Sequence, residues 1–218
     1  MGINYIMISD EILKSETLSV PAKFVAMIML YVSNNNLKTN VFEKTLVERF
    51  GYSEEYYSKY LNELANHANK YITITRKFLN GKTKNSYTLN YLNPKDYKII
   101  PFNLFNILGE TADRDIMKNG KKCYKTIKFD SNAFVYYAKL KLYINSSTLE
   151  RDDWRKSDIE KFLKTNKPTN NKYLYLFENI PTKLIIIETE DQKNKIKLKL
   201  IFEQTLKEKI SDEKIQIF

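Results

Sequence analysis

Residues 41–64 read VFEKTLVERFGYSEEYYSKYLNEL, and their apolar residues recur at the spacing of two short helices. Gly51 lies between the two helices and can take the left-handed backbone conformation that ends the first one. Ser53 can then cap the second helix, which would bury Tyr57 and Leu61. The stretch therefore predicts two helices joined by a tight turn, a helix-turn-helix.

The outward side of the second helix carries mostly polar side chains. In a helix-turn-helix protein this side enters the major groove of DNA, where side chains near the start of the helix reach the base edges. The candidate DNA-contacting residues on this helix are Ser53, Glu55, Tyr56, Ser58, Lys59 and Asn62.

The flanking segments extend the pattern. Upstream, Pro21 opens an apolar helix that can pack under the pair. Downstream, two alternating runs flank Asn80-Gly81, which is typical of a β-hairpin. Three helices followed by a hairpin predict a winged helix. The cations of this hairpin, which suit a phosphate backbone or minor groove, are Arg76, Lys77, Lys82 and Lys84.

The pattern over residues 1–92 resembles the N-terminal winged helix of plasmid and phage replication initiators, and many bacterial regulators share it. In such proteins the positions after the turn usually include arginines or other donors, whereas this chain has Glu54 and Glu55. A winged helix used for dimerisation or partner contact therefore stays open as the rival reading. The resemblance rests on a strand at Tyr5 to Ile8, Leu-Ser-Val-Pro-Ala at 18–22, TLVERFGYSEEYYSKYLNEL at 45–64, and the wing.

From Asp130 the order of elements repeats. Helical patterns at 131–147, 155–165 and 172–180 precede two strand patterns that surround 191–194. The sequence therefore predicts an α+β chain with two winged-helix domains in tandem. In this order it resembles the two-domain replication initiators, in which one domain chiefly supports dimerisation and the other contacts repeated origin sites most strongly.

The second domain supplies further candidate DNA contacts. Asparagine can pair with adenine and tyrosine can contact phosphate or sugar, although the stretch after residue 171 also reads as core. The lysines of the second hairpin suit phosphates, or serve to solubilise an edge strand. The residues concerned are Asn170, Asn171, Lys172 and Tyr173 at the third helix, and Lys193, Lys195 and Lys197 at the hairpin.

We expect domain boundaries at 1–93 and 130–218. The segment 94–129 between them would be a connection or a part of the second domain, and could hold a short helix and a hairpin around Asn119-Gly120.

The chain of 218 residues carries 36 Lys and Arg against 26 Asp and Glu, a net charge of +10. Such an excess favours a polyanionic partner. Abundant lysine, asparagine, isoleucine and tyrosine also suggest an AT-rich genome, which would raise the lysine content without any binding role. The exposed aromatic candidates for stacking on single strands are Tyr52, Tyr56, Tyr60 and Phe78.

Enzymatic chemistry is not expected. His67 is the only histidine and Cys123 the only cysteine, so neither a paired-histidine metal centre nor a disulfide framework can form within one chain. We expect no cofactor, no membrane span and a cytoplasmic location. The expected partner is double-stranded DNA, and the resemblance also admits a homodimer and proteins of the replication machinery. Transcriptional regulation and a protein-interaction scaffold are the alternative functions.

Overall fold

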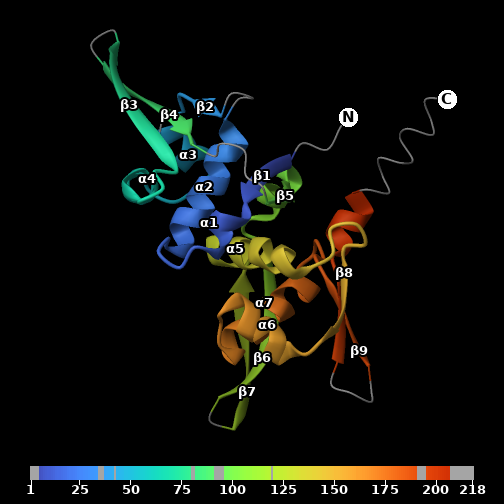
Figure 1. Cartoon of the computed structure of the whole chain (residues 1–218). Helices are drawn as coiled ribbons and strands as arrows, with labels where there is room; N and C mark the ends of the chain where they lie inside the picture. Colours follow the sequence, from blue (N-terminus) through green and yellow to red (C-terminus); the bar gives the residue numbers. More distant parts are fainter. Residues whose placement is uncertain are drawn as a thin grey trace, which may run out of the picture. The chain divides into compact units, whose positions relative to one another are not determined.

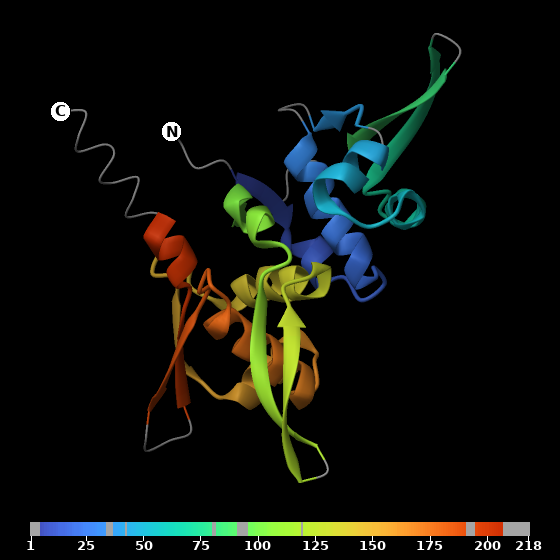
Figure 2. The same ribbon diagram turned by 180° about the vertical axis from the view of Figure 1, so that it is seen from behind.

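The computed structural model describes residues 5–33, 37–41, 43–79, 82–90, 96–118, 120–190 and 195–206. The chain is a mixture of α-helices and small antiparallel sheets, as the sequence predicted at the level of fold class. It divides into two compact units, Tyr5–Phe102 and Asn103–Phe218. Figure 1 and Figure 2 show the elements of both units from opposite sides.

The first unit combines helices with a three-stranded and a two-stranded sheet. Strands pair in the order β2-β4-β3, while β1 pairs with β5. Its elements are β1 (Tyr5–Ser9), α1 (Asp10–Lys14), α2 (Val20–Val32), β2 (Lys38–Thr39), α3 (Glu43–Phe50), α4 (Glu54–Asn66), β3 (Ile72–Leu79), β4 (Lys82–Leu89) and β5 (Tyr97–Pro101).

The core of the first unit is built around α2. The Ser19 hydroxyl accepts a hydrogen bond from the Ala22 amide at the start of this helix, and Pro21 occupies the first turn, where no amide donor is needed. Every residue from Ala22 to Leu30 is buried, and both α4 and β1 pack against this helix. The apolar run therefore forms a central helix, as the sequence predicted.

The second unit has a two-stranded and a three-stranded sheet. β6 pairs with β7, and the other strands pair in the order β8-β10-β9. A further helix covers 201–206. The remaining elements are η1 (Phe102–Ile107), β6 (Thr111–Lys118), β7 (Lys121–Lys128), α5 (Ser131–Leu140), η2 (Lys141–Tyr143), β8 (Glu150–Trp154), α6 (Lys156–Leu163), α7 (Lys167–Asn179), β9 (Ile186–Glu190) and β10 (Lys195–Lys199).

The two units share one order of elements. In the first unit, helix, strand, helix, helix, strand, strand corresponds to α2, β2, α3, α4, β3 and β4; in the second it corresponds to α5, β8, α6, α7, β9 and β10. In each unit the short strand after the first helix pairs with the last strand, which therefore lies at the centre of its sheet. The repeat is thus one of topology, and the sheet order is the same in both units.

Several details of the second unit differ from the sequence prediction. α5 begins at Ser131 as predicted but ends at Leu140 rather than continuing to 147. Asp130 caps it, since its carboxylate accepts from the Ala133 amide at 2.9 Å. α7 begins at Lys167, because Asn166 caps it and proline is tolerated in a first helical turn. The strand β8 was not expected at all.

The segment 94–129 is distributed between the units. Strand β5 pairs with β1 in the first unit, and the division falls between Phe102 and Asn103 instead of near 93. The short helix and the hairpin foreseen in this segment correspond to η1 and to β6 with β7. Along the described part of the chain, no helix combines the length and apolar character needed to cross a membrane.

Candidate nucleic-acid interface

The turn between α3 and α4 is fixed by backbone conformation and by one buried tyrosine. Gly51 has φ 75°, a left-handed conformation that favours glycine, and its amide bonds to the Val47 carbonyl at 2.9 Å. The hydroxyl of Tyr57 lies 2.8 Å from the Gly51 carbonyl oxygen and 3.3 Å from that of Leu46. Because Tyr57 belongs to α4, it holds this helix against the end of α3.

The start of α4 is stabilised by two of the predicted contact residues. The Ser53 hydroxyl accepts a hydrogen bond from the Tyr56 amide at 3.2 Å, which caps the helix. The pKa of the Glu55 carboxyl is lowered, first by a hydrogen bond from Ser53 and then by its own backbone amide. A carboxylate here also interacts favourably with the positive end of the helix dipole. Ser53 and Glu55 therefore stabilise the helix start directly.

The outward face of α4 is polar and exposed. Ser58, Lys59 and Asn62 are exposed along it, which agrees with their predicted orientation. The Lys59 ammonium lies 5.3 Å from the centre of the Tyr60 ring, a cation–π distance. This face therefore presents a hydroxyl, an ammonium and an amide, which are the groups that can donate to phosphates and base edges.

Aromatic rings line the flank of the same helix. Tyr56, which is half-buried, stacks on Tyr52 with ring centres 4.4 Å apart and meets Tyr60 edge-on at 4.7 Å. These ring contacts hold Tyr56 against its neighbours, so its side chain is less accessible to DNA than the sequence predicted for the outward side of this helix.

Two acidic side chains of this unit are directed toward donors within it. Glu63 of α4 accepts from the Ser19 amide at 2.7 Å and from the Ser19 hydroxyl at 2.8 Å, at the start of α2. Glu43 of α3 accepts from Asn85 and from the Tyr87 hydroxyl of β4. Glu63 thus ties α4 to the start of α2 and Glu43 ties α3 to β4, so both carboxylates are engaged within the unit.

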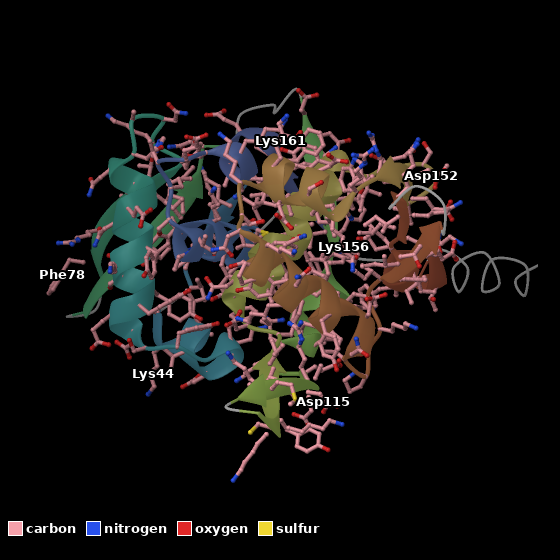
Figure 3. All side chains as sticks on the ribbon, turned by 90° about the horizontal axis from the view of Figure 1, so that it is seen from below. Lys44, Phe78, Asp115, Asp152, Lys156 and Lys161 are labelled. Carbon is pink, nitrogen blue, oxygen red and sulfur yellow. The ribbon has the colours of Figure 1, made fainter. Side chains whose placement is uncertain are left out.

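The hairpin predicted around Asn80-Gly81 corresponds to β3 and β4. Arg76 is exposed on it, and Phe78 is 76% exposed, the most exposed large apolar side chain of the described chain (Figure 3). The backbones of Lys77, Lys82 and Lys84 belong to the paired strands, but their side chains lie outside the described part. The wing thus offers one described cation beside an exposed aromatic ring.

In the second unit, two predicted base-contacting residues are part of the core. Asn170 is fully buried: it accepts a hydrogen bond from the Tyr136 hydroxyl and donates one to the Lys156 carbonyl oxygen at 3.2 Å. Tyr173 is 8% exposed, and burial raises its pKa to about 12. The prediction of DNA contact was wrong for both in this fold, because the inward face of α7 begins at Asn170.

Asn171 and Lys172 lie beside these residues and are half-exposed on α7. The Lys172 ammonium lies 4.6 Å from the centre of the Tyr173 ring. Both side chains remain accessible to a ligand at the first half of this helix.

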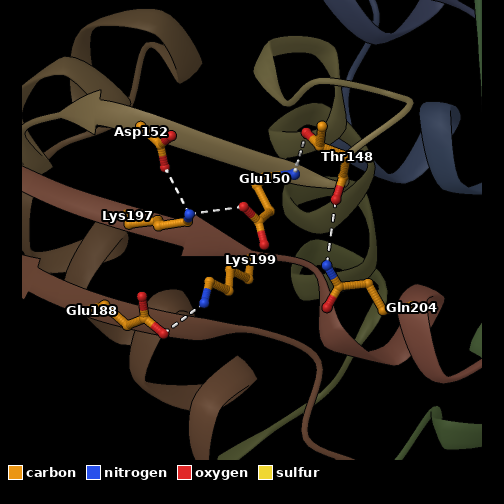
Figure 4. A network of polar contacts seen from close by, with 7 residues as sticks. All are labelled: Thr148, Glu150, Asp152, Glu188, Lys197, Lys199 and Gln204. Carbon is orange, nitrogen blue, oxygen red and sulfur yellow. Dashed lines mark hydrogen bonds and ion pairs between the residues drawn. The ribbon is translucent and has the colours of Figure 1, made fainter.

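The lysines of the second hairpin are largely engaged by acids. Lys197 contacts Glu150 at 2.9 Å and Asp152 at 3.5 Å across β8, while Lys199 contacts Glu188 at 2.7 Å (Figure 4). The pKa of the Glu150 carboxyl is lowered, first by the hydrogen bond from Lys197, and the pKa of Lys197 is raised by the same bond.

Lys197 therefore stabilises the sheet, and its prediction as a phosphate contact is corrected. Lys195 is half-buried on the same strand, and Lys193 lies outside the described residues. The sequence left the alternating lysines as phosphate contacts or as solubilising residues of an edge strand, because the strand β8, which carries the acidic partners of Lys197, was not recognised.

A group of exposed lysines around the α6–α7 turn was missed. Figure 3 labels two of them, Lys156 and Lys161, on α6. Lys164 ends this helix in the left-handed conformation, and Asn166 caps the next helix by accepting from the Thr169 amide at 2.9 Å. The spacing of lysines in RKSDIEKFLKTNK was the available signal. The exposed members of the group are Lys156, Lys161, Lys164 and Lys167.

Among the residues that the structure describes, no group of three or more His, Cys, Asp and Glu side chains is arranged to hold a metal ion. Comparisons with family models, with curated proteins and with solved structures find no match to this chain.

Proposed function

We propose that this protein binds double-stranded DNA in a sequence-specific manner through two tandem winged helices, and that it acts without catalysis in the cytoplasm as a plasmid or phage replication initiator. The observation that carries the proposal is the shared order of helix, strand, helix, helix, strand, strand, with the same sheet order in both units. This order supports a helix-turn-helix followed by a wing in each unit.

The first unit supplies the base-reading surface. With α4 in the major groove, Asn62 and Ser58 reach base edges. The amide of Asn62 can pair bidentately with adenine, and the hydroxyl of Ser58 can hydrogen-bond to several kinds of base edge. Lys59 and Arg76 then hold phosphates on either side of the groove. The engagement of Glu43 and Glu63 by donors within the unit reduces the repulsion that a phosphate backbone would meet here.

The second unit holds the duplex mainly through its backbone. Its exposed lysines surround the α6–α7 turn, and Asn171 and Lys172 lie next to them. Lysine neutralises phosphates without reading sequence. Two such units in one chain suit binding sites that are repeated or extended, which favours an initiator. A transcriptional regulator of a mobile element is the alternative within the same class.

A protein-interaction scaffold is the candidate from a different class. Glu54 and Glu55 at the start of α4 would repel a nearby phosphate, and the adjoining rings of Tyr52, Tyr56 and Tyr60 could pack on a protein. The same acids also stabilise the helix start, so their position alone does not decide between the classes.

Two matched double variants test the proposal. Lys59→Gln with Arg76→Gln removes two exposed cations from the proposed interface, whereas Lys197→Gln with Lys199→Gln removes two ion-paired ones. Both lower the net charge by the same amount. Binding to sheared genomic duplex is measured by fluorescence anisotropy as a function of salt, since the slope of log affinity against log salt counts phosphate contacts.

The proposal expects the first double variant to weaken binding and to reduce the salt slope by about 1.8, while the second keeps the slope of the wild type. If the salt slopes of the two double variants are equal, α4 and the β3–β4 hairpin do not contact the phosphates of the duplex. A wild-type chain that retains no duplex even at low salt would favour the scaffold.

A further inference from the structure

The hairpin formed by β6 and β7 is long and regular, and its base is anchored in the second unit. All eight residues of β6 pair with β7, from Thr111 with Lys128 to Lys118 with Lys121. At the base, Ala112 and Ile127 are buried. Figures 1 and 2 both show the strands extending beyond the helices of their unit. The distal half therefore projects as an arm.

Contacts with α7 set the direction of this arm. The Tyr175 hydroxyl of α7 donates a hydrogen bond to the Asp113 carbonyl oxygen at 2.7 Å, and the Arg114 guanidinium lies 5.4 Å from the centre of the Tyr175 ring. Directly before β6, at the base of the hairpin, Glu110 accepts hydrogen bonds from the Thr182 amide at 2.9 Å and from the Thr182 hydroxyl at 2.6 Å. The arm consequently begins against the middle of the helix whose first half carries Asn171 and Lys172.

The distal half exposes large apolar side chains to an unusual degree. Met117 is 71% exposed and Tyr124 is 73% exposed, and only Phe78 of the other hairpin exceeds them among the described residues. Met117 pairs with Lys122, and Tyr124 pairs with Asp115, so these four side chains share one face of the ribbon. Exposed apolar groups at the end of a projecting hairpin indicate a contact surface.

Cations accompany these side chains on both faces. Lys121 and Lys125 are exposed on the face opposite Tyr124. On the face of Tyr124, Lys122 contacts Asp115 at 2.6 Å, and Asp115 is the only acid in the sequence from 115 to 125. Because Asp115 pairs with Lys122, the excess positive charge lies on the face of Lys121 and Lys125, which suits a phosphate strand along that side of a groove.

The same construction occurs in the wing of the first unit. Both hairpins consist of two eight-residue strands joined by Asn-Gly, as in ITITRKFL-NG-KTKNSYTL and TADRDIMK-NG-KKCYKTIK. Phe78 and Met117 occupy the corresponding position, in the pair next to the last one before the turn. The β6–β7 arm therefore repeats the length, turn and apolar position of the hairpin that the proposed function places against DNA.

We propose that the β6–β7 arm is an additional DNA-binding element, which enters a groove of the duplex beside α7. Lys121 and Lys125 contact phosphates along the groove, while Met117 and Tyr124 on the other face contact sugars and base edges. A two-stranded ribbon has the dimensions of the major groove. This inference rests on the proposed function and adds a binding element to it.

The single thiol of the chain provides the probe. Cys123 lies on β7 between Lys122 and Tyr124 and is half-exposed. Its rate of alkylation by N-ethylmaleimide is measured by mass spectrometry in the wild-type chain, with and without saturating duplex. In parallel, the salt slope of duplex binding is compared between Lys121→Gln with Lys125→Gln and the control Lys197→Gln with Lys199→Gln.

The expected result is slower alkylation of Cys123 when duplex is bound, together with a slope reduced by about 1.8 only in the Lys121 and Lys125 double variant. If the duplex binds but the alkylation rate and the salt slope are both unchanged, the β6–β7 arm does not bind DNA, and the proposed function remains intact. Failure of the wild type to bind any duplex overturns the proposed function itself. Protection of Cys123 that grows with protein concentration and needs no DNA assigns the arm to a protein interface and also overturns the inference.

Discussion

The Tyr57 hydroxyl lies 2.8 Å from the carbonyl oxygen of Gly51, and this contact joins α4 to the turn that precedes it. The orientation of the proposed base-reading helix therefore depends on a hydrogen bond made from the buried side of that same helix. Burial is the main cause that raises the pKa of this phenol, so the hydroxyl keeps its proton and can donate throughout the physiological range.

Replacing Tyr57 with phenylalanine should destabilise the protein. The substitution removes the hydroxyl that donates to the part-buried Gly51 carbonyl oxygen, which costs about 0.5–1.5 kcal/mol of unfolding free energy. Urea denaturation followed by circular dichroism measures the loss. Tyr60→Phe is the control, because no hydrogen bond of its hydroxyl is found within the described part of the chain, and it should change stability by less than about 0.5 kcal/mol. Equal losses for the two variants would show that the bond to Gly51 contributes nothing particular.

Asn170→Ala should affect stability and leave DNA sequence preference unchanged. The Asn170 amide is fully buried between the Tyr136 hydroxyl and the Lys156 carbonyl oxygen. Its removal leaves these two polar groups without their hydrogen-bond partner, which lowers the free energy of unfolding by about 1–3 kcal/mol. Asn171→Ala, one residue further along α7, should be nearly neutral in stability. Denaturation midpoints and binding to a fixed duplex distinguish the two effects. A stable Asn170→Ala variant with altered sequence preference would restore the base-contact role that the fold denies it.

Glu203→Gln should destabilise the second unit strongly. Glu203, in the helix at 201–206, forms a buried ion pair with Lys141 at 2.5 Å and accepts from the Tyr137 hydroxyl at 3.0 Å. Breaking a buried pair by removing one charge costs about 3–5 kcal/mol, because the remaining charge stays buried. Glu188→Gln breaks the more exposed pair with Lys199 and should cost less than about 1 kcal/mol. Thermal unfolding of both variants tests the contrast, which fails if their losses are alike.

The loss of folding stability at acid pH should depend in part on Glu150. Lys197 lowers the pKa of this carboxyl in the folded protein, so its contribution is fully present above the unfolded value and is lost as the pH falls through the lower folded value. Carbon-detected NMR titration of Glu150 should therefore give a value below the ordinary 4.5. In Lys197→Gln the value should return toward 4.5. An unchanged titration in that variant would show that the ion pair does not form in solution.

Local chemistry made the helix-turn-helix and the hairpins readable in the sequence. Gly51 and Ser53 lie where the backbone needs a left-handed turn and a cap, and α4 begins at Glu54, directly after the predicted cap. The Asn-Gly pairs likewise indicate both long hairpins, because a two-residue turn of this type depends on local backbone conformation and not on tertiary contacts.

What escaped prediction depends on contacts between distant residues. The two-residue strand β2 and the charged strand β8 have no local strand pattern and exist because β4 and β10 pair with them. Because β8 was not predicted, the acidic partners of Lys197 were not recognised and Lys197 became a candidate phosphate contact. Asn170 was misread for a similar reason, since its burial follows from the position of Tyr136 on another helix.

Selection of bound duplexes from a random pool at near-physiological salt, using the wild-type chain and Asn62→Ala in parallel, tests the central claim most directly. The account predicts that the wild type enriches a repeated or extended motif and that Asn62→Ala loses preference at one position of that motif, with a cost of about 1–3 kcal/mol there. Recovery of an unenriched pool, or of no duplex at all, from the wild-type chain would contradict sequence-specific DNA binding.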